Sequence, residues 1–321
     1  MDSLSSRPVR FPRLSRRQFL AECAVAVGFP LMTKAAPPQD PGLAGQVGIT
    51  TSSLFRQNAG RATDRNFEHW DIPRILRDEL DMKVIDLSTG TLGSSRERKR
   101  LDRMRQAAAD AGCVITNLKV NATHLGVKVL DLPFDHADRS IRRAAIDEYK
   151  QWIRAAQRLG ARWLRPFPSE KRPEWSILID SYRELAEFGA EHGVTLVVEN
   201  ATWIRSDSQA IPNLVRTLMG KIAAAPDTGS WDPSIRFDAL AAAFPHAVTC
   251  DFKVADLTPD FEHRAYDLRR CFATGWKAGF RGPWCIEHGN QNTGRLFREW
   301  RWIKAQIENW TNEMARQPDL P

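Results

Sequence analysis

Four carboxylate residues in the second half of the chain each end a short apolar run. They are Glu199, Asp227, Asp251 and Glu287, separated by 28, 24 and 36 residues. A buried carboxylate is costly unless it is paired or bound to a metal, and a converging set of oxygen ligands is what a hard divalent cation requires. If the apolar runs are strands of one parallel barrel, the four acids lie at the same end of it. We therefore interpret them as one shared site and not as four unrelated surface acids.

The elements that would position these acids alternate between short apolar runs and longer amphipathic runs. Helical patterns cover residues 139–159, 175–192, 210–219, 261–278 and 296–314, and strand candidates cover 46–50, 83–87, 114–120, 162–167, 195–199, 221–226, 247–253 and 283–287. Alternation of strand and helix with right-handed crossovers predicts a parallel sheet. Eight strands in one continuous alternation predict a closed (β/α)₈ TIM barrel, in which the chemistry lies at the C-terminal ends of the strands.

The composition fits a globular barrel. The 321 residues are 42% hydrophobic and 26% charged, which excludes a disordered chain. The net charge of +7 comes from 46 Lys and Arg against 39 Asp and Glu. The basic cluster at 96–105 has helix-like sequence with acids interleaved, which favours a solvated helix face over a nucleic-acid groove. We therefore expect no nucleic-acid partner.

The N-terminal residues are typical of an export signal. Residues 14–20 read Leu-Ser-Arg-Arg-Gln-Phe-Leu, and a mildly apolar stretch follows at 24–32, as in a twin-arginine leader. The alternative interpretation is a basic amphipathic arm. We predict a leader at residues 1–36, a linker at 37–45 and the barrel at 46–315. The mature protein is then expected in the periplasm.

A stable membrane anchor is not expected. No run approaches the ~18 uninterrupted apolar residues that a membrane span needs, and Glu22 stands where lipidation of Cys23 would need a small residue. The remaining cysteines form no Cys-x-x-Cys pair, so buried free thiols are predicted.

Three motifs resemble those of the xylose isomerase-like TIM barrels, also called the sugar phosphate isomerase/epimerase superfamily. Residues 197–200, Val-Val-Glu-Asn, are similar to its fifth-strand Glu-Asn, and residues 226–229, Pro-Asp-Thr-Gly, to its sixth-strand Asp-Thr-Gly. Residues 279–287 are similar to its eighth-strand Gly-Tyr-x-Gly-x-x-x-x-Glu. The resemblance spans residues 46–310. It implies that Glu199, Asp227 and Glu287 bind one divalent metal and that the two glutamates also move the substrate proton.

The seventh strand departs from that pattern. The family's His-x-Lys stands here as Asp251-Phe252-Lys253, and Ser230 stands where many members carry His or Asn. Asp251 as the fourth ligand favours Mn²⁺ or Mg²⁺ over Zn²⁺, because oxygen replaces imidazole. Lys253 lies on the same strand face as Asp251. It would either face the substrate or neutralise Asp251, in which case the metal site is weakened or lost.

The mechanism that the resemblance implies is proton abstraction next to the carbonyl of a carbohydrate or keto-sugar. Return of the proton gives an isomerase or an epimerase. One alternative is a keto-glycoside lyase, which eliminates the aglycone after the same deprotonation. Another is a non-catalytic exported sugar-binding barrel with a decayed metal site. A DNA-repair nuclease on this barrel would need several His ligands for zinc, which the sequence does not offer.

Five further residues are candidates for substrate binding. His124 follows the third strand, and a surface-loop role is its alternative. His288 follows Glu287 but points away by strand alternation. Arg165 would clamp an anionic group or pair with Glu199. Trp203 and Trp231 lie four residues beyond two of the acids. Their rings would stack on a sugar or pack a loop.

The last helical pattern is rich in tryptophan. Trp300, Trp302 and Trp310 all fall in residues 296–314. They are expected to pack this helix against the barrel or to form the interface of a homo-oligomer.

Overall fold

The computed structural model describes residues 40–54, 68–120, 123–124, 127–128, 133–290 and 292–316. The chain divides into two units, Met1–Ala35 and Ala36–Pro321, and all the described residues belong to the second. The predicted leader at 1–36 lies outside the described residues. Within the predicted linker, Pro41–Leu43 form a turn of 3₁₀ helix (η1) just before the first strand.

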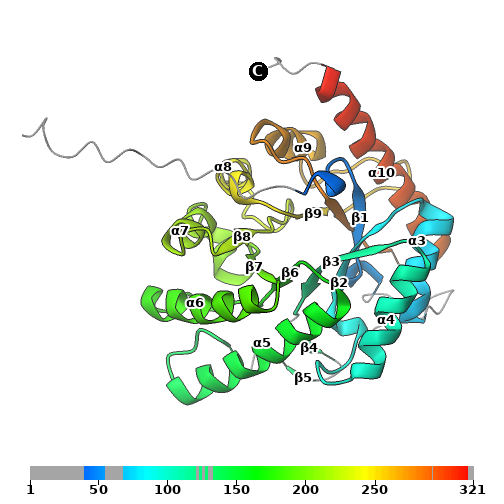
Figure 1. The fold of residues 1–321 in the computed structure, drawn as a ribbon. Coiled ribbons are helices and arrows are strands. Elements are labelled where there is room, and N and C mark those ends of the chain that lie inside the picture. Colours follow the sequence, from blue (N-terminus) through cyan, green and yellow to red (C-terminus); the bar gives the residue numbers. More distant parts are fainter. Residues whose placement is uncertain are drawn as a thin grey trace, which may run out of the picture. The chain divides into compact units, whose positions relative to one another are not determined.

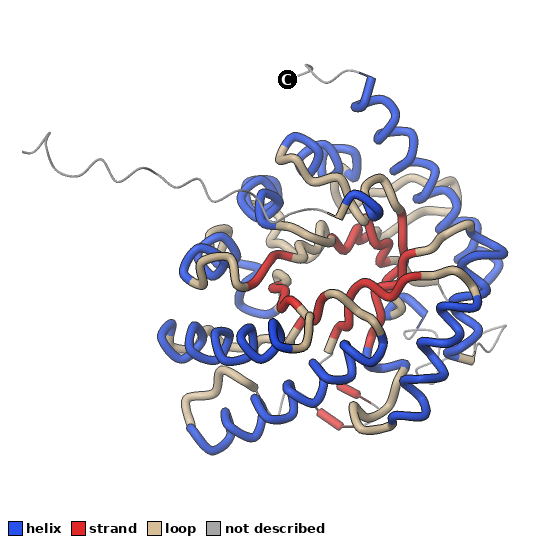
Figure 2. The backbone as a smooth tube through the Cα atoms, viewed as in Figure 1, coloured by secondary structure: helices blue, strands red, loops and turns tan. Residues whose placement is uncertain are grey.

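Within the described ranges, eight parallel strands form one sheet in the order β8-β7-β6-β3-β2-β1-β10-β9. Their bounds are β1 Val47–Thr50, β2 Val84–Ser88, β3 Val114–Lys119, β6 Trp163–Arg165, β7 Thr195–Val198, β8 Ile222–Ala224, β9 Cys250–Lys253 and β10 Trp284–Glu287. Isolated parallel bridges, Ala224 to Ala247 and Asp227 to Asp251, join the two ends of this order. Figure 2 shows the strands in the centre with helices around them. The predicted (β/α)₈ barrel is confirmed.

Helices follow the strands and cover the outside of the sheet (Figure 1). Their bounds are α3 Ile72–Leu80, α4 Arg98–Asp110, α5 Arg139–Leu159, α6 Trp175–Glu191, α7 Ala210–Thr217, α8 Arg236–Ala243, α9 Leu268–Lys277 and α10 Thr293–Arg316. Short elements are η2 His69–Asp71, η3 Thr89–Thr91, η5 Thr202–Ser206, η6 Phe244–His246 and the hairpin β4 Thr123–His124 with β5 Val127–Lys128. Among the described residues, we find no helix both long and apolar enough to cross a bilayer.

Helix α5 shows how local sequence signals set the bounds of a helix. The Asp138 side chain accepts hydrogen bonds from the backbone N–H groups of Ser140 and Ile141, which caps the first turn. Gly160 ends the helix with a φ of 77°, a left-handed conformation that glycine adopts at little cost. The bounds of this helix are those the periodicity predicts.

Helix α9 begins later than predicted. The pattern indicated a helix over residues 261–278, but α9 begins at Leu268. Asp267 caps it by accepting a hydrogen bond from the Arg270 N–H, and Phe261 has a φ of 63°, which a right-handed helix cannot contain. Apolar residues in the preceding loop extended the helical pattern without forming a helix.

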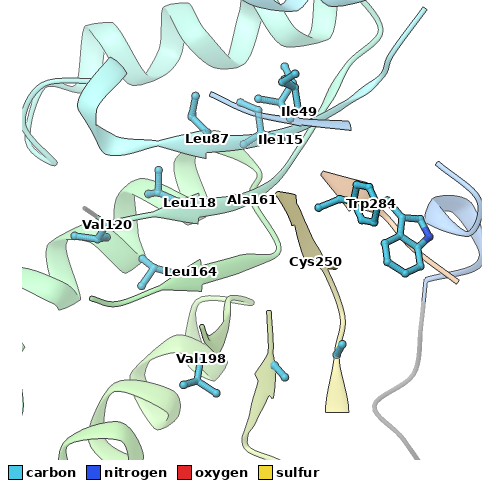
Figure 3. Packing of buried hydrophobic residues seen from close by; sticks show 14 of the residues in the cluster. Ile49, Leu87, Ile115, Leu118, Val120, Ala161, Leu164, Val198, Cys250 and Trp284 are labelled. Atoms are coloured by element: carbon cyan, nitrogen blue, oxygen red, sulfur yellow. The ribbon is translucent and has the colours of Figure 1, made fainter. Parts of the chain in front are cut away.

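Alternation along the strands separates a packed outer face from a polar inner face. Leu118 and Leu164 (Figure 3) are register partners on β3 and β6. They belong to the same core cluster as Ile153 of α5. Their chain neighbours Lys119 and Arg165 are also register partners. Because successive strand residues point to opposite faces, these two cations point into the barrel.

An aromatic cluster holds the last two strands in place. The ring of Trp284 on β10 lies 4.6 Å from Phe272, 4.8 Å from Phe280 and 5.8 Å from Phe252 of β9, centroid to centroid. Such clusters add specific geometry to burial. Strands β9 and β10 carry two of the four acids, so this packing fixes their position.

The cysteines of the described region confirm the prediction of free thiols. They are buried and unpaired: Cys113, Cys250, Cys271 and Cys285.

Candidate active site

The strand ends bring the four predicted acids together. Glu199 and Asp227 follow β7 and β8, Asp251 lies in β9 and Glu287 ends β10. Asp227 and Asp251 are partners in an isolated bridge. Carboxylate oxygens of Glu199, Asp227 and Asp251 all lie within 4.8 Å of one another. All three are buried, with relative exposures of 8%, 1% and 2%.

A lysine that the sequence analysis did not single out lies among these acids. Lys119, at the end of β3, is 3% exposed. Its ammonium donates a hydrogen bond to Asp251 Oδ2 and forms an ion pair of 3.2 Å with Glu199 Oε2. The pKa of Lys119 is raised well above its usual value, because the carboxylates of Asp251, Glu199 and Asp86 outweigh the effect of burial. Lys119 therefore stays charged inside the barrel.

Lys253 bridges the other two acids. Its Nζ lies 2.9 Å from Asp227 Oδ2 and 3.0 Å from Glu287 Oε1. Lys253 and Glu287 are register partners on β9 and β10, which explains their pairing. Lys253 therefore does not neutralise Asp251, which pairs with Lys119 instead. The alternative, that Lys253 faces the substrate, stays a prediction.

Arg165 pairs with Glu199, one of the two roles predicted for it. Its Nε lies 3.0 Å from Glu199 Oε2, and its guanidinium also donates to the Val120 carbonyl at 3.0 Å. Burial alone would raise the pKa of Glu199, but Arg165, Lys119 and Lys253 outweigh it and lower the pKa to about 2. Glu199 is ionised at neutral pH.

The other glutamate is also ionised. Burial opposes the charge of Glu287, yet the ammonium groups of Lys253 and Lys119 hold its pKa below the usual value. Asp251 differs: burial, reinforced by the carboxylates of Glu199, Asp86 and Glu287, raises its pKa well above the usual value despite Lys119. The site therefore holds two charged glutamates beside an aspartate that retains a proton more readily.

Asp227 is engaged on both carboxylate oxygens. Its Oδ1 accepts hydrogen bonds from the N–H groups of Gly229 and Ser230, at 2.7 and 3.0 Å. Its Oδ2 accepts from the Ser230 hydroxyl at 2.6 Å and from Lys253 at 2.9 Å. This explains Ser230 in structural terms, because its hydroxyl fixes the acid and also accepts from Lys253 at 3.2 Å.

A fifth buried acid, Asp86 on β2, lies beside the site. It is 1% exposed and accepts a hydrogen bond of 3.1 Å from Asn117 Nδ2. Its Oδ1 has no hydrogen-bond partner among the described residues. Burial, only partly offset by Lys119 and Asn117, raises its pKa from 3.8 to about 6.

This raised pKa gives a stability prediction. Between the unfolded value of 3.8 and the folded value of about 6, only the unfolded state releases the proton of Asp86. The free energy of unfolding should therefore fall as pH rises through this window, by up to about 3 kcal/mol at about 1.4 kcal/mol per unit. Urea unfolding at several pH values would measure it. In Asp86→Asn this contribution should be absent, and equal pH slopes for the two proteins would contradict the prediction.

The residues present do not fit a resident divalent ion well. The donors are carboxylate oxygens, which suit Mn²⁺ or Mg²⁺, and Asp251 Oδ1 is buried with no hydrogen-bond partner among the described residues. However, Asp227 already accepts four hydrogen bonds, and a lysine ammonium contacts each of the four acids. The positive charge that an ion would supply is already in place.

Two other predicted substrate contacts, His288 and Trp231, are buried. His288 is 6% exposed, and its ring nitrogens contact the Val254 carbonyl at 2.8 Å and Glu299 Oε2 at 2.7 Å. Both nitrogens are thus engaged away from the four acids, in the direction that strand alternation indicated. Trp231 is 1% exposed, so its ring packs inside and presents no open face.

Trp203 and His124 remain candidates for substrate binding. Trp203 is partly buried against the core, with the Arg172 guanidinium 5.2 Å from its ring centroid. His124 lies in β4, and its side chain is outside what the structure describes.

Lys119 could have been found from the sequence. In the second half of β3, Asn117 and Lys119 share one face of the strand, opposite Leu118. A polar face on an otherwise apolar strand indicates polar partners across the barrel. The partners themselves, Asp251 and Glu199, cannot be derived from that pattern, because barrel register decides them.

This fold, with acids at the C-terminal ends of its strands, is similar to that of the xylose isomerase-like TIM barrels. A family model described as "Xylose isomerase-like TIM barrel" matches residues 79–228 of the chain. No curated protein matches the sequence.

Solved structures agree on the fold. D-Psicose 3-epimerase with D-tagatose from Clostridium cellulolyticum H10 has a TM-score of 0.62 at 13% identity, covering 83% of this chain and 99% of that one. The 3-keto-D-glucoside 4-epimerase of E. coli has a TM-score of 0.60 at 10% identity, with coverages of 81% and 99%. A xylose isomerase-like TIM barrel protein from Mycobacterium smegmatis in complex with magnesium has a TM-score of 0.56 at 15% identity, with coverages of 86% and 100%. At these identities, the similarity shows the fold.

Proposed function

We propose that the chain is a sugar isomerase or epimerase that abstracts a proton next to the carbonyl of a carbohydrate or keto-sugar. The observation that carries the proposal is the pair of ionised glutamates, Glu199 and Glu287, set among cationic side chains at the C-terminal ends of the strands. Two of the structural neighbours are named as sugar epimerases, which supports a carbohydrate substrate.

The proposed steps need an acceptor for the proton and a positive group near the carbonyl oxygen. One glutamate removes the proton from the carbon next to the carbonyl, and the electron pair moves through the carbon–carbon bond onto the oxygen. The nearby cations stabilise the enolate oxygen. Return of the proton to the opposite face gives the epimer, and return to the neighbouring carbon gives the isomer.

In contrast to the expectation from the sequence, we do not expect the proposed reaction to depend on a divalent metal. In related barrels a divalent ion would polarise the carbonyl, and one structural neighbour is in complex with magnesium. Here, the four acids that would hold Mn²⁺ or Mg²⁺ are in ion pairs with Lys119 and Lys253.

The same ion pairs favour a second candidate function. A barrel whose acids are neutralised internally would serve as a non-catalytic sugar-binding protein. The keto-glycoside lyase differs from the epimerase only after deprotonation, by loss of the aglycone. Export of the chain would suit both alternatives and remains a prediction, because the leader lies outside the described residues.

Solvent exchange tests the proposed function. The wild-type protein is incubated in D₂O with a panel of aldoses, ketoses and 3-keto-glycosides, and NMR follows the carbon next to each carbonyl. We expect deuterium at this carbon in at least one sugar, with an epimer or isomer as the product. Release of an aglycone would identify the lyase instead. Saturable sugar binding without exchange would identify the binding barrel and overturn the proposal.

A further inference from the structure

The two lysines divide the four acids into two pairs. Lys119 contacts Asp251 and Glu199, and Lys253 contacts Asp227 and Glu287. Each ammonium thus lies where it shares the charge of two carboxylates. A divalent ion bound by the same oxygens would lie close to both ammonium groups, and like charges at short range repel strongly in a buried site.

The two lysines differ in their access to a ligand. The side chain of Lys119 is 3% exposed, whereas that of Lys253 is 23% exposed. Among the acids that they contact, Glu287 is the most exposed, at 12% of its side chain, and it is a partner of Lys253. Lys119 is therefore a buried counter-ion that a ligand cannot reach. Lys253 and Glu287 form the part of the site that is accessible to a ligand.

Lys253 is held on several sides. The Tyr266 hydroxyl donates a hydrogen bond of 2.6 Å to the Lys253 carbonyl, and the Lys253 N–H donates to Thr228 Oγ1 at 3.0 Å. Gly229 lets these groups approach, because a Cβ there would lie 2.4 Å from the Tyr266 hydroxyl and 2.8 Å from Lys253 Cδ. A fixed cation beside an ionised glutamate is suited to catalysis, since it needs little reorganisation during the reaction.

We propose that the two lysines replace the divalent ion in this barrel and that Lys253 is the catalytic group that polarises the substrate carbonyl. As Glu199 or Glu287 takes the proton from carbon, the carbonyl oxygen gains the electron pair and accepts a hydrogen bond from the Lys253 ammonium. The proton then returns to carbon and the carbonyl re-forms, so no oxidant or co-reactant is needed. The role of Lys253 rests on the proposed function, whereas the absence of a resident ion does not.

Calorimetric titration with Mn²⁺ tests the replacement without any need for activity. The full chain is treated with a chelator, desalted and titrated, and Asp227→Asn is titrated in parallel. We expect no saturable site in the wild-type protein. One Mn²⁺ bound per chain, lost in Asp227→Asn, would overturn the replacement whether or not the protein turns over a sugar.

Exchange kinetics test Lys253 on a sugar identified by solvent exchange. Removing one preorganised donor to a developing oxyanion costs on the order of 10²- to 10³-fold in kcat, so we expect this loss in Lys253→Met and partial recovery in Lys253→Arg. The chelator should leave the wild-type rate unchanged. Lys221→Met is the matched control, because this exposed lysine pairs with Glu187 on the surface. Full kcat in Lys253→Met, or a rate that Mn²⁺ restores after chelation, would overturn the assignment. Absence of any exchange in the wild-type protein would instead overturn the proposed function.

Discussion

Replacing Lys119 with methionine should lower the free energy of unfolding by about 3–5 kcal/mol. The change removes a cation that contacts the buried carboxylates of Asp251 and Glu199, and breaking a buried ion pair typically costs this much. Lys119 is 3% exposed and its partner Asp251 is 2% exposed, so solvent cannot replace the lost contact. Methionine keeps nearly the length of the side chain, so the change removes charge more than volume. Urea denaturation at neutral pH measures the difference.

Two companion variants separate charge from packing. Lys119→Met combined with Asp251→Asn removes both charges of the Lys119–Asp251 pair and leaves Glu199 paired with Arg165, so it should recover most of the lost stability. Lys221→Met removes an exposed lysine of the ion pair with Glu187, which should cost less than about 1 kcal/mol. If Lys119→Met were as stable as Lys221→Met, the ion pair inside the barrel would contribute no more to the free energy of unfolding than the surface pair, which would contradict the prediction.

Replacing Glu287 with glutamine should lower the rate of solvent exchange by about 10²- to 10⁴-fold. This is the usual contribution of a positioned proton acceptor, and an amide cannot take the proton. The fold should tolerate the change, because Lys253 keeps its contact of 2.9 Å with Asp227. The rate of deuterium incorporation under saturating sugar measures the effect.

The matched control is Glu187→Gln, the same substitution in helix α6. The Glu187 side chain is 54% exposed and pairs with Lys221 on the surface. It should leave exchange unchanged. A Glu287→Gln protein that exchanges at the wild-type rate would remove Glu287 from the mechanism and leave Glu199 as the single candidate for proton transfer.

Much of the fold could be predicted because it depends on local patterns. Each of the eight strand candidates overlaps a strand of the sheet, and the cap at Asp138 and the glycine at 160 set the bounds of α5. Helix α9 was predicted too long, because apolar loop residues such as Phe261 continue a helical periodicity that the backbone does not follow. The sequence contains no signal of the left-handed conformation at Phe261.

The four acids could be predicted from their spacing, but their partners could not. Asp251, in the place of a histidine of the similar barrels, suggested a changed metal site. Lys253, two residues later on the same strand face, was the cation predicted either to neutralise it or to face the substrate. The true partner of Asp251 is Lys119, 132 residues earlier in the chain. Only the order of the strands, which brings β3 and β9 to face each other across the barrel interior, makes this pair.

Trp231 and His288 illustrate a second limit. Strand alternation indicated that His288 points away from the acids, but the tertiary contacts that bury Trp231 and hold His288 have no local signal. Glu299 of α10 binds His288, and although burial opposes its charge, hydrogen bonds from His288, Arg295 and Asn290 hold the pKa of Glu299 below the usual value. No local pattern relates a strand end to a residue of the following helix in this way.

The barrel closes where its chemistry is expected. Strands β8 and β9 share no continuous ladder and are joined by isolated bridges, one of which pairs Asp227 with Asp251. Backbone hydrogen bonds from Thr228 to the Asp251 carbonyl and from Asp251 to the Pro226 carbonyl, at 2.9 and 3.0 Å, complete this seam. If the proposed sugar binds beside Asp227 and Asp251, it contacts residues on both sides of this seam. Its binding would then be thermodynamically linked to closure of the barrel.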